Sequence, residues 1–168
     1  GTFGVNTSNA ALPRPAVGGA AFLAGHIAKL KASNPLNVVV GAGDFIGATP
    51  LISALFFDEP SVETVNRIGL DFVAVGNHEF DKPPAVLARQ QQWVKFPLLS
   101  ANILRNGQPA FEPYRIFERG GHRIAVMGLT TDDTPKIALP ANVAGLRFAK
   151  PADEAAKLLP ELRGKADM

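Results

Sequence analysis

The sequence predicts an α/β domain with mainly parallel central strands and one added β-hairpin. Short apolar runs alternate with helical patterns over residues 18–102, and this rhythm is typical of a parallel sheet. Residues 114–119 alternate, Gly120-Gly121 makes a turn, and residues 122–128 continue as a strand, which is a hairpin signature. A chain of 168 residues with 46% hydrophobic residues is long enough for one domain with a sizeable core.

The first elements follow from local patterns. Residues 1–17 show no period and are predicted to form a loop. Residues 18–32 repeat apolar side chains at helical spacing. Residues 37–41 are apolar without alternation, which predicts a strand buried on both faces. Thr49-Pro50 predicts a helix start, with the hydroxyl as cap and proline at the first helical position.

The later elements complete the pattern. A helix near 61–68 should end at Gly69, because glycine readily adopts the left-handed conformation that closes a helix. An amphipathic helix over 152–163 closes the chain, with Pro160 able to kink it. Between them we expect strand 71–75, a helix near 83–92 and strand 97–101.

Composition excludes several classes of function. The net charge of +2 comes with no basic run or basic aromatic face, so a nucleic-acid polymer is not an expected partner. Cysteine is absent, which excludes disulfides and thiolate metal ligands. No apolar stretch reaches the roughly 20 residues of a membrane span. No secretory signal is present, although a signal could have been cleaved.

Two polar clusters follow neighbouring predicted strands. Gly43-Asp44 follows strand 37–41, and Gly-Asn-His-Glu-Phe-Asp at 76–81 follows strand 71–75. Carboxyl ends of parallel strands open on one edge of a sheet, so Asp44, Asn77 and His78 should share a crevice. Carboxylate, amide and imidazole groups together suit Mn²⁺, Zn²⁺ or Mg²⁺.

Plainer interpretations compete for some of these residues. Asp81 precedes Lys82-Pro83-Pro84 and could simply cap the next helix. Glu79 is expected to be a surface side chain. His26 and His122 are expected to be a helix-surface and a hairpin-turn residue, which leaves only His78 for chemistry.

The ordered motifs resemble the calcineurin-like metallophosphoesterases, and more closely their bacterial 5′-nucleotidase / 2′,3′-cyclic-nucleotide phosphodiesterase branch. The resemblance rests on residues 43–50, 63–71, 76–81, 100–103, 114–116 and 124–130, so it covers nearly the whole chain. It implies a four-layer α/β/β/α sandwich with a dimetal centre at the strand ends.

By this resemblance each motif residue has an expected role. Asp44 would bridge two divalent metal ions (Mn, Zn or Mg), and Asn77 would bind one of them. His78 would act on the phosphoryl transition state as a catalytic group, and Asp81 would orient its ring.

Parts of the family pattern are missing. The family's first motif is Asp-x-His, whereas the first aspartate of this chain is Asp44, and the later Gly-His-x-His motif is absent too. We therefore expect residues 1–168 to be a partial catalytic domain without the substrate-binding domain. Two ligands cannot hold two cations, so the chain alone should hydrolyse little or nothing.

The predicted function is hydrolysis of phosphate esters by a metal-activated water, with nucleotides as the expected substrates. One alternative keeps the chemistry but changes the substrate to nucleotide sugars or other esters. Another is a non-catalytic, degenerate module of the same fold. The resemblance also implies a periplasmic or secreted protein.

Overall fold

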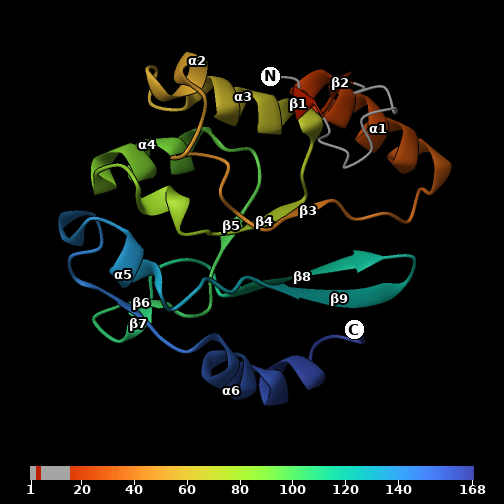
Figure 1. Ribbon diagram of the computed structural model, residues 1–168. Coiled ribbons are helices and arrows are strands. Elements are labelled where there is room, and N and C mark those ends of the chain that lie inside the picture. The colour runs from red at the N-terminus through yellow and green to blue at the C-terminus, as the bar shows by residue number, and fades with distance from the viewer. Residues whose placement is uncertain (1–2, 5–15) are drawn as a thin grey trace, which may run out of the picture. The chain divides into compact units, whose positions relative to one another are not determined.

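The computed structural model describes residues 3–4 and 16–168, and it divides into two compact units, residues 1–37 and 38–168. The prediction of a single partial catalytic domain stays a prediction. In the first unit β1 (Phe3–Gly4) pairs antiparallel with β2 (Ala16–Val17), and α1 (Ala20–Ser33) confirms the first predicted helix (Figure 1). Most of the loop predicted for 1–17 lies outside the described residues.

The second unit contains the predicted parallel sheet. Its strands are β3 (Val40–Gly41), β4 (Phe72–Ala74) and β5 (Leu98–Leu99), hydrogen-bonded in that order and all parallel. The mainly parallel arrangement is therefore confirmed. The first strand is shorter than expected, and the side chain of Val40 is 58% exposed, so the prediction of a strand buried on both faces was wrong. An unbroken apolar run does not by itself show that both faces are covered.

The connecting helices lie where the sequence placed them, with one difference at a start. They are α2 (Leu51–Ala54), α3 (Glu59–Ile68) and α4 (Pro84–Trp93). Gly69 closes α3 with a φ of 77°, as predicted. Thr49 does not cap α2, however. Pro50 is the cap residue, and the Thr49 hydroxyl donates to the carboxylate of Asp58 instead.

The antiparallel part contains the predicted hairpin and three strands that were not predicted. β8 (Tyr114–Arg119) pairs with β9 (His122–Met127), and Arg119 lies opposite His122 across the turn. A second small sheet has the order β10 (Leu146–Phe148), β6 (Ile103–Arg105), β7 (Gln108–Pro109). These strands are only two or three residues long, too short for a clear periodic pattern. The remaining elements are η1 (His78–Phe80), α5 (Thr134–Ile137), η2 (Pro140–Asn142) and α6 (Pro151–Arg163).

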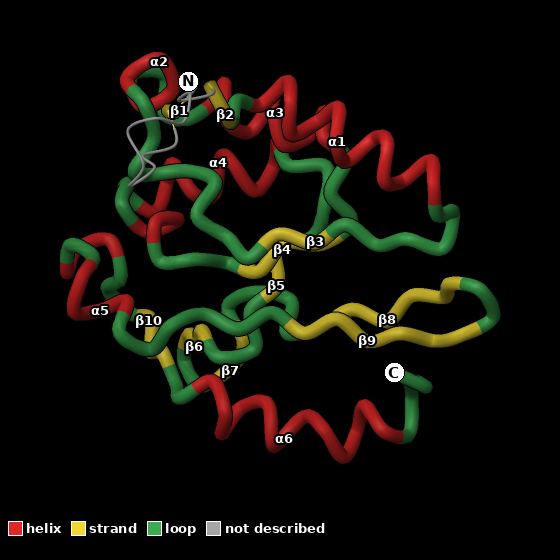
Figure 2. The backbone as a smooth tube through the Cα atoms, turned by 45° about the vertical axis from the view of Figure 1, so that its right-hand side comes forward, coloured by secondary structure: helices red, strands yellow, loops and turns green. Residues whose placement is uncertain are grey.

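Within this unit the elements lie in layers. In Figure 2, α3 and α4 lie on one side of β3, β4 and β5, the β8–β9 hairpin lies on the other, and α6 lies beyond the hairpin. Phe72 on β4 stacks on Phe117 on β8 with ring centroids 5.0 Å apart, and the Tyr114 hydroxyl on β8 donates to Glu161 on α6 at 2.7 Å. The full four-layer sandwich of the family stays a prediction. No helix of the described chain is long and apolar enough to span a membrane.

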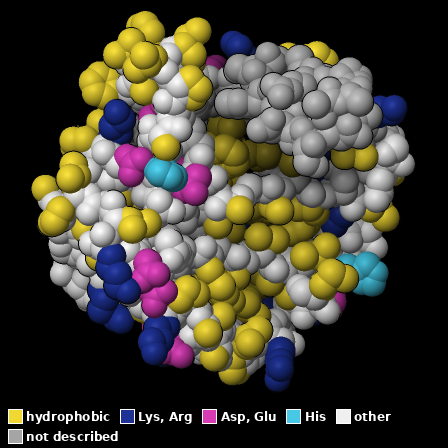
Figure 3. Space-filling model, in the orientation of Figure 1, with side chains coloured by type: hydrophobic (Ala, Val, Ile, Leu, Met, Phe, Trp, Pro, Cys, Tyr) yellow, Lys and Arg dark blue, Asp and Glu magenta, His cyan; other side chains and the backbone are white. Residues whose placement is uncertain are grey.

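An apolar patch covers the surface of α2 and the turn after it. Hydrophobic side chains gather over α2 in Figure 3. All members of the patch are more than half exposed: Leu51, Ile52, Leu55, Phe56 and Phe57. The main core lies elsewhere, around Val62, Val75, Phe80 and Ile103.

Candidate active site

The two strand-end clusters of the sequence come together in the structure. Asp44 follows β3, and residues 76–81 follow β4, which is the adjacent parallel strand. The backbone N–H of His78 donates to Asp44 Oδ1 at 3.1 Å. Asn77 is half-buried at the start of the short turn η1, where its carbonyl accepts the Phe80 N–H at 3.1 Å. The structure therefore brings Asp44, Asn77 and His78 together at one edge of the sheet, as the sequence predicted.

Two glycines allow the loops to approach this closely. Gly43 has a φ of 88°, and a Cβ on it would lie 2.4 Å from the backbone nitrogen of Gly76. A Cβ on Gly76 would lie 2.1 Å from Asp44 Oδ1. Both distances are far below a normal contact, so only glycine fits at either position. The sequence spacing Gly43-Asp44 and Gly76-Asn77 therefore encodes direct backbone packing between the two loops.

Glu79 holds the two loops together, although the sequence predicted a surface side chain. Its side chain is only 4% exposed. Its carboxylate accepts three backbone N–H groups, from Asp44 at 3.0 Å, Phe45 at 3.0 Å and Gly76 at 2.6 Å. The surface prediction was wrong because the backbone donors of a distant loop surround this position, and a local sequence pattern does not show them.

Burial raises the pKa of the Glu79 carboxyl, and the three backbone N–H groups oppose this shift without cancelling it. The nearby negative charge of Asp44 adds to the rise. The buried position of Glu79 therefore favours the neutral form of its carboxyl.

His78 and Asp81 form a close pair. His78 Nδ1 lies 2.6 Å from Asp81 Oδ2, and both side chains are about one-third exposed. The hydrogen bond to Asp81 raises the pKa of His78, burial lowers it to a smaller extent, and the negative charges of Asp81, Asp44 and Glu79 add to the rise. The imidazole is thus biased toward its cationic form. Asp81 does not cap α4, whose cap residue is Pro83 without a side-chain bond, so the plainer interpretation of Asp81 was wrong.

The donors present fit part of a metal centre. Asp44 offers carboxylate oxygens and Asn77 an amide oxygen, which are ligands that hard divalent cations accept. Among the described residues, however, no three His, Cys, Asp or Glu side chains are grouped so that they could hold a metal ion. Residues 1–17 contain none of these four residue types. Grouped carboxylates and imidazoles of the described residues therefore do not form a complete dimetal centre.

The other two histidines lie outside the cluster. His26 on α1 and His122 at the start of β9 are both exposed, in agreement with the sequence interpretation.

A buried polar network supports the loop that begins at Gly76. The sequence analysis did not single out the residues of this network. The Thr130 hydroxyl donates to the carbonyl of Val75 at 2.6 Å, immediately before Gly76. Asn102 accepts the Thr130 N–H at 2.8 Å and donates to the Thr130 carbonyl at 2.7 Å, and Ser100 lies 2.9 Å from the Thr130 hydroxyl. The only sequence signal was that these residues lie in stretches carrying the family resemblance.

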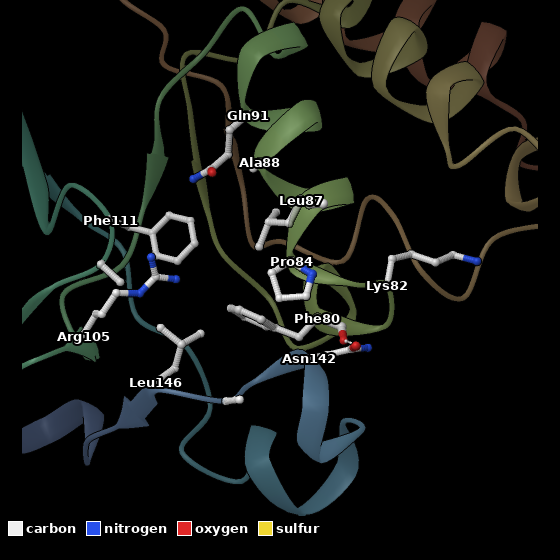
Figure 4. Close-up of a pocket in the computed structure, with 13 residues that line it drawn as sticks. Phe80, Lys82, Pro84, Leu87, Ala88, Gln91, Arg105, Phe111, Asn142 and Leu146 are labelled. Carbon is white, nitrogen blue, oxygen red and sulfur yellow. Dashed lines mark hydrogen bonds between the residues drawn. The ribbon is translucent and has the colours of Figure 1, made fainter.

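A pocket of about 350 Å³ lies beside the motif rather than over it. Figure 4 shows Phe111, Arg105 and Gln91 pointing into one space beside Leu87, Pro84 and Phe80. The lining does not include Asp44, Asn77, His78 or Asp81. The buried amide of Asn142 donates to the Phe80 carbonyl at 2.9 Å and so joins this wall to η1. The pocket is therefore separate from the predicted site.

No family model matches the sequence. The chain is 43% identical over 140 residues to a 5′-nucleotidase of Vibrio cholerae, covering 82% of this chain and 25% of that protein. It is 50% identical over 107 residues to the protein UshA of Escherichia coli K12, covering 62% of this chain and 20% of that protein. The chain thus spans about a quarter or less of the length of these curated relatives.

A solved structure agrees with the sequence comparison. The 5′-nucleotidase precursor of Thermus thermophilus superposes with a TM-score of 0.77 at 30% identity, covering 89% of this chain and 30% of that chain. Shared sequence and shared fold together show that the chain belongs to the calcineurin-like metallophosphoesterases, in the branch of the bacterial 5′-nucleotidases.

Proposed function

We propose that this chain is part of the catalytic domain of a metal-dependent phosphoesterase that acts on nucleotides. The observation that carries the proposal is the pair formed by His78 and Asp81, 2.6 Å apart, beside the carboxylate of Asp44. Relatives that share this segment carry the name 5′-nucleotidase, which supports a nucleotide substrate.

We assign each residue of the site a role from its chemistry. Asp44 and Asn77 would hold part of a divalent metal centre with Mn, Zn or Mg. When bound, such ions supply a water nucleophile at neutral pH and charge stabilisation at the phosphoryl oxygens. Nδ1 of His78 is hydrogen-bonded to Asp81. The other ring nitrogen, Nε2, can therefore donate a hydrogen bond from the cationic imidazole to the phosphoryl group. Asp81 fixes the tautomer of the ring and favours its protonated form.

A chimera tests this function. The 140 matched residues of the Vibrio cholerae 5′-nucleotidase would be replaced by the matching part of this chain, and hydrolysis of AMP would be measured with Mn²⁺. We expect turnover, and His78→Asn should lower kcat by about 10²–10⁴-fold, as the loss of a positioned acid–base group does. His122→Asn, an exposed histidine in the hairpin, is the matched control and should change nothing.

The chain by itself should behave differently. Because it offers two of the expected ligands, we propose that it binds Mn²⁺ weakly, loses that binding in Asp44→Asn, and does not hydrolyse AMP. Calorimetric titration with Mn²⁺ and an AMP assay on the same sample measure both. Tight binding of two equivalents with turnover would overturn the assignment of ligands. A folded chimera that binds metal but is inert would favour the alternative of a degenerate, non-catalytic module, and one that cleaves nucleotide sugars or other esters but not AMP would favour the alternative substrates.

We also propose that the protein is exported to the periplasm or secreted. The support is the family resemblance and the word precursor in the name of the Thermus thermophilus relative. Detection of the protein in a periplasmic fraction, with a cytoplasmic enzyme as the control, tests this proposal.

A further inference from the structure

A second buried carboxylate, which no sequence motif marked, holds the loop that leads away from Asp44. Asp58 follows α2 and is completely buried. It accepts the backbone N–H of Gly47 at 3.0 Å and the hydroxyl of Ser53 at 3.1 Å, and the Thr49 hydroxyl donates to it as well. None of the described residues forms an ion pair with it.

This arrangement is unfavourable on its own. A buried charge without a countercharge loses its hydration, and only hydrogen bonds offset that loss. Asp58 also has a left-handed φ of 63°, and Phe57 before it has a φ of 51°, although neither is glycine. Strained backbone of this kind persists where the surrounding structure requires it, and it is typical of functional sites.

Gly47 connects Asp58 to the candidate active site. Its φ is 94°, and a Cβ on it would lie 2.5 Å from the carbonyl oxygen of His78 and 2.6 Å from Asp81 Oδ2. The backbone of Gly47 therefore packs directly on the carboxylate oxygen that pairs with His78 Nδ1. Through its bond to the Gly47 N–H, Asp58 fixes the position of this backbone.

We propose that Asp58 is a positioning residue for the pair of His78 and Asp81. Asp58 holds Gly47, and Gly47 confines the Asp81 carboxylate to the one side of the His78 ring where it accepts from Nδ1. Glu79 accepts the backbone N–H groups of Asp44 and Phe45 at the start of the same loop. Glu79 thus fixes the start of this loop, and Asp58 fixes it further along, at Gly47. This positioning role rests on the proposed phosphoester reaction, but the contacts among Asp58, Gly47 and Asp81 do not depend on that reaction.

The test uses the metal-free 168-residue chain in EDTA and observes the imidazole Nδ1–H of His78 by ¹⁵N-edited NMR. The signal is assigned with His26→Gln and His122→Gln. Asp58→Asn replaces one carboxylate oxygen by an NH2 group, so either the Gly47 N–H loses its acceptor or the bonds to the Thr49 and Ser53 hydroxyls must reverse. We expect the Nδ1–H to exchange with water about tenfold faster, as the loss of one hydrogen bond predicts. No metal and no turnover are involved, so failure of the proposed function would leave this result unchanged.

Asp71→Asn is the matched control. Asp71 also accepts a backbone N–H, that of Val39 at 2.8 Å, and it pairs with Arg119 at 4.0 Å, and neither partner belongs to the loop of Gly47. We expect this variant to lose stability without faster exchange at His78. Thr49→Val is the second variant if Asp58→Asn does not fold, because it removes one donor and keeps the carboxylate. Unchanged exchange in the folded Asp58 or Thr49 variant, or equal acceleration in Asp71→Asn, would overturn the proposal.

Discussion

Removing the carboxylate of Glu79 should loosen the whole candidate site. Three backbone N–H groups from two loops end on this side chain, and it is the only described group that binds both the loop of Asp44 and the loop of Gly76 through their backbone donors. Glu79→Ala would leave all three donors without their partner in a buried place. Glu79→Gln would keep the shape of the side chain but replace one oxygen with a donor.

The expected losses of stability follow from the number of hydrogen bonds that each variant loses and from the burial of Glu79. Each buried donor that loses its partner costs about 1–3 kcal/mol. Glu79→Ala leaves three such donors, but water that enters the space left by the side chain offsets part of the total cost. The raised pKa of Glu79 shows that burial also opposes its charge, which lowers the net benefit of the wild-type contacts. We therefore expect Glu79→Ala to lower the free energy of unfolding by about 3–5 kcal/mol. Glu79→Gln can keep the two bonds made by Oε2 and should lose about 1–3 kcal/mol.

Urea unfolding measures these values, followed by the fluorescence of Trp93, the single tryptophan, which packs against the core. Glu63→Gln is the matched control, because Glu63 is exposed and pairs only with Arg67 at 3.8 Å. It should change stability by less than about 0.5 kcal/mol. Amide exchange should speed up at Gly76 in Glu79→Ala and at Phe45 in both Glu79 variants, but at neither position in Glu63→Gln. If Glu79→Ala costs no more than Glu63→Gln, the carboxylate does not hold the loops and the reasoning is refuted.

Further predictions concern protons and packing in the same site. Folding raises the pKa of Glu79 above 4.5 and that of His78 above 6.5, so the folded chain binds protons more tightly than the unfolded chain. The stability contributed by His78 is fully present below 6.5 and is lost as pH rises through its raised pKa, and the ionisation of Glu79 acts in the same direction. In EDTA, urea unfolding should therefore show stability falling from about pH 5 to about pH 8, and a rise over that range would contradict the assignment. Asp81→Asn should lower the pKa of His78 toward 6.5, measured by NMR titration of its ring, because the hydrogen bond to Asp81 is the main cause of the shift. Gly43→Ala should cost more than about 2 kcal/mol of stability, because its Cβ would meet the other loop at 2.4 Å. Gly25→Ala, with nothing within 4 Å on a helix, should be neutral or stabilising by up to about 1 kcal/mol.

Much of the fold follows from signals that act over a few residues. Gly69 ends α3 because glycine takes the left-handed conformation without steric cost, and Gly120-Gly121 turns the hairpin for the same reason. These local preferences are written in the sequence at the place where they act. The short strands β6, β7 and β10 have no such signal, and the pairing of β6 with β10 joins residues about 40 positions apart.

The candidate site shows the same division. The sequence by itself determined that Asp44, Asn77, His78 and Asp81 follow two strands of one sheet, because strand ends and glycine turns are local features. Only the tertiary structure decided that Glu79 is buried between the two loops and that Asp58 holds the far end of one of them. The bonds that hold these loops come from backbone N–H groups, which every residue except proline carries, so no pattern of side chains in the sequence can reveal them.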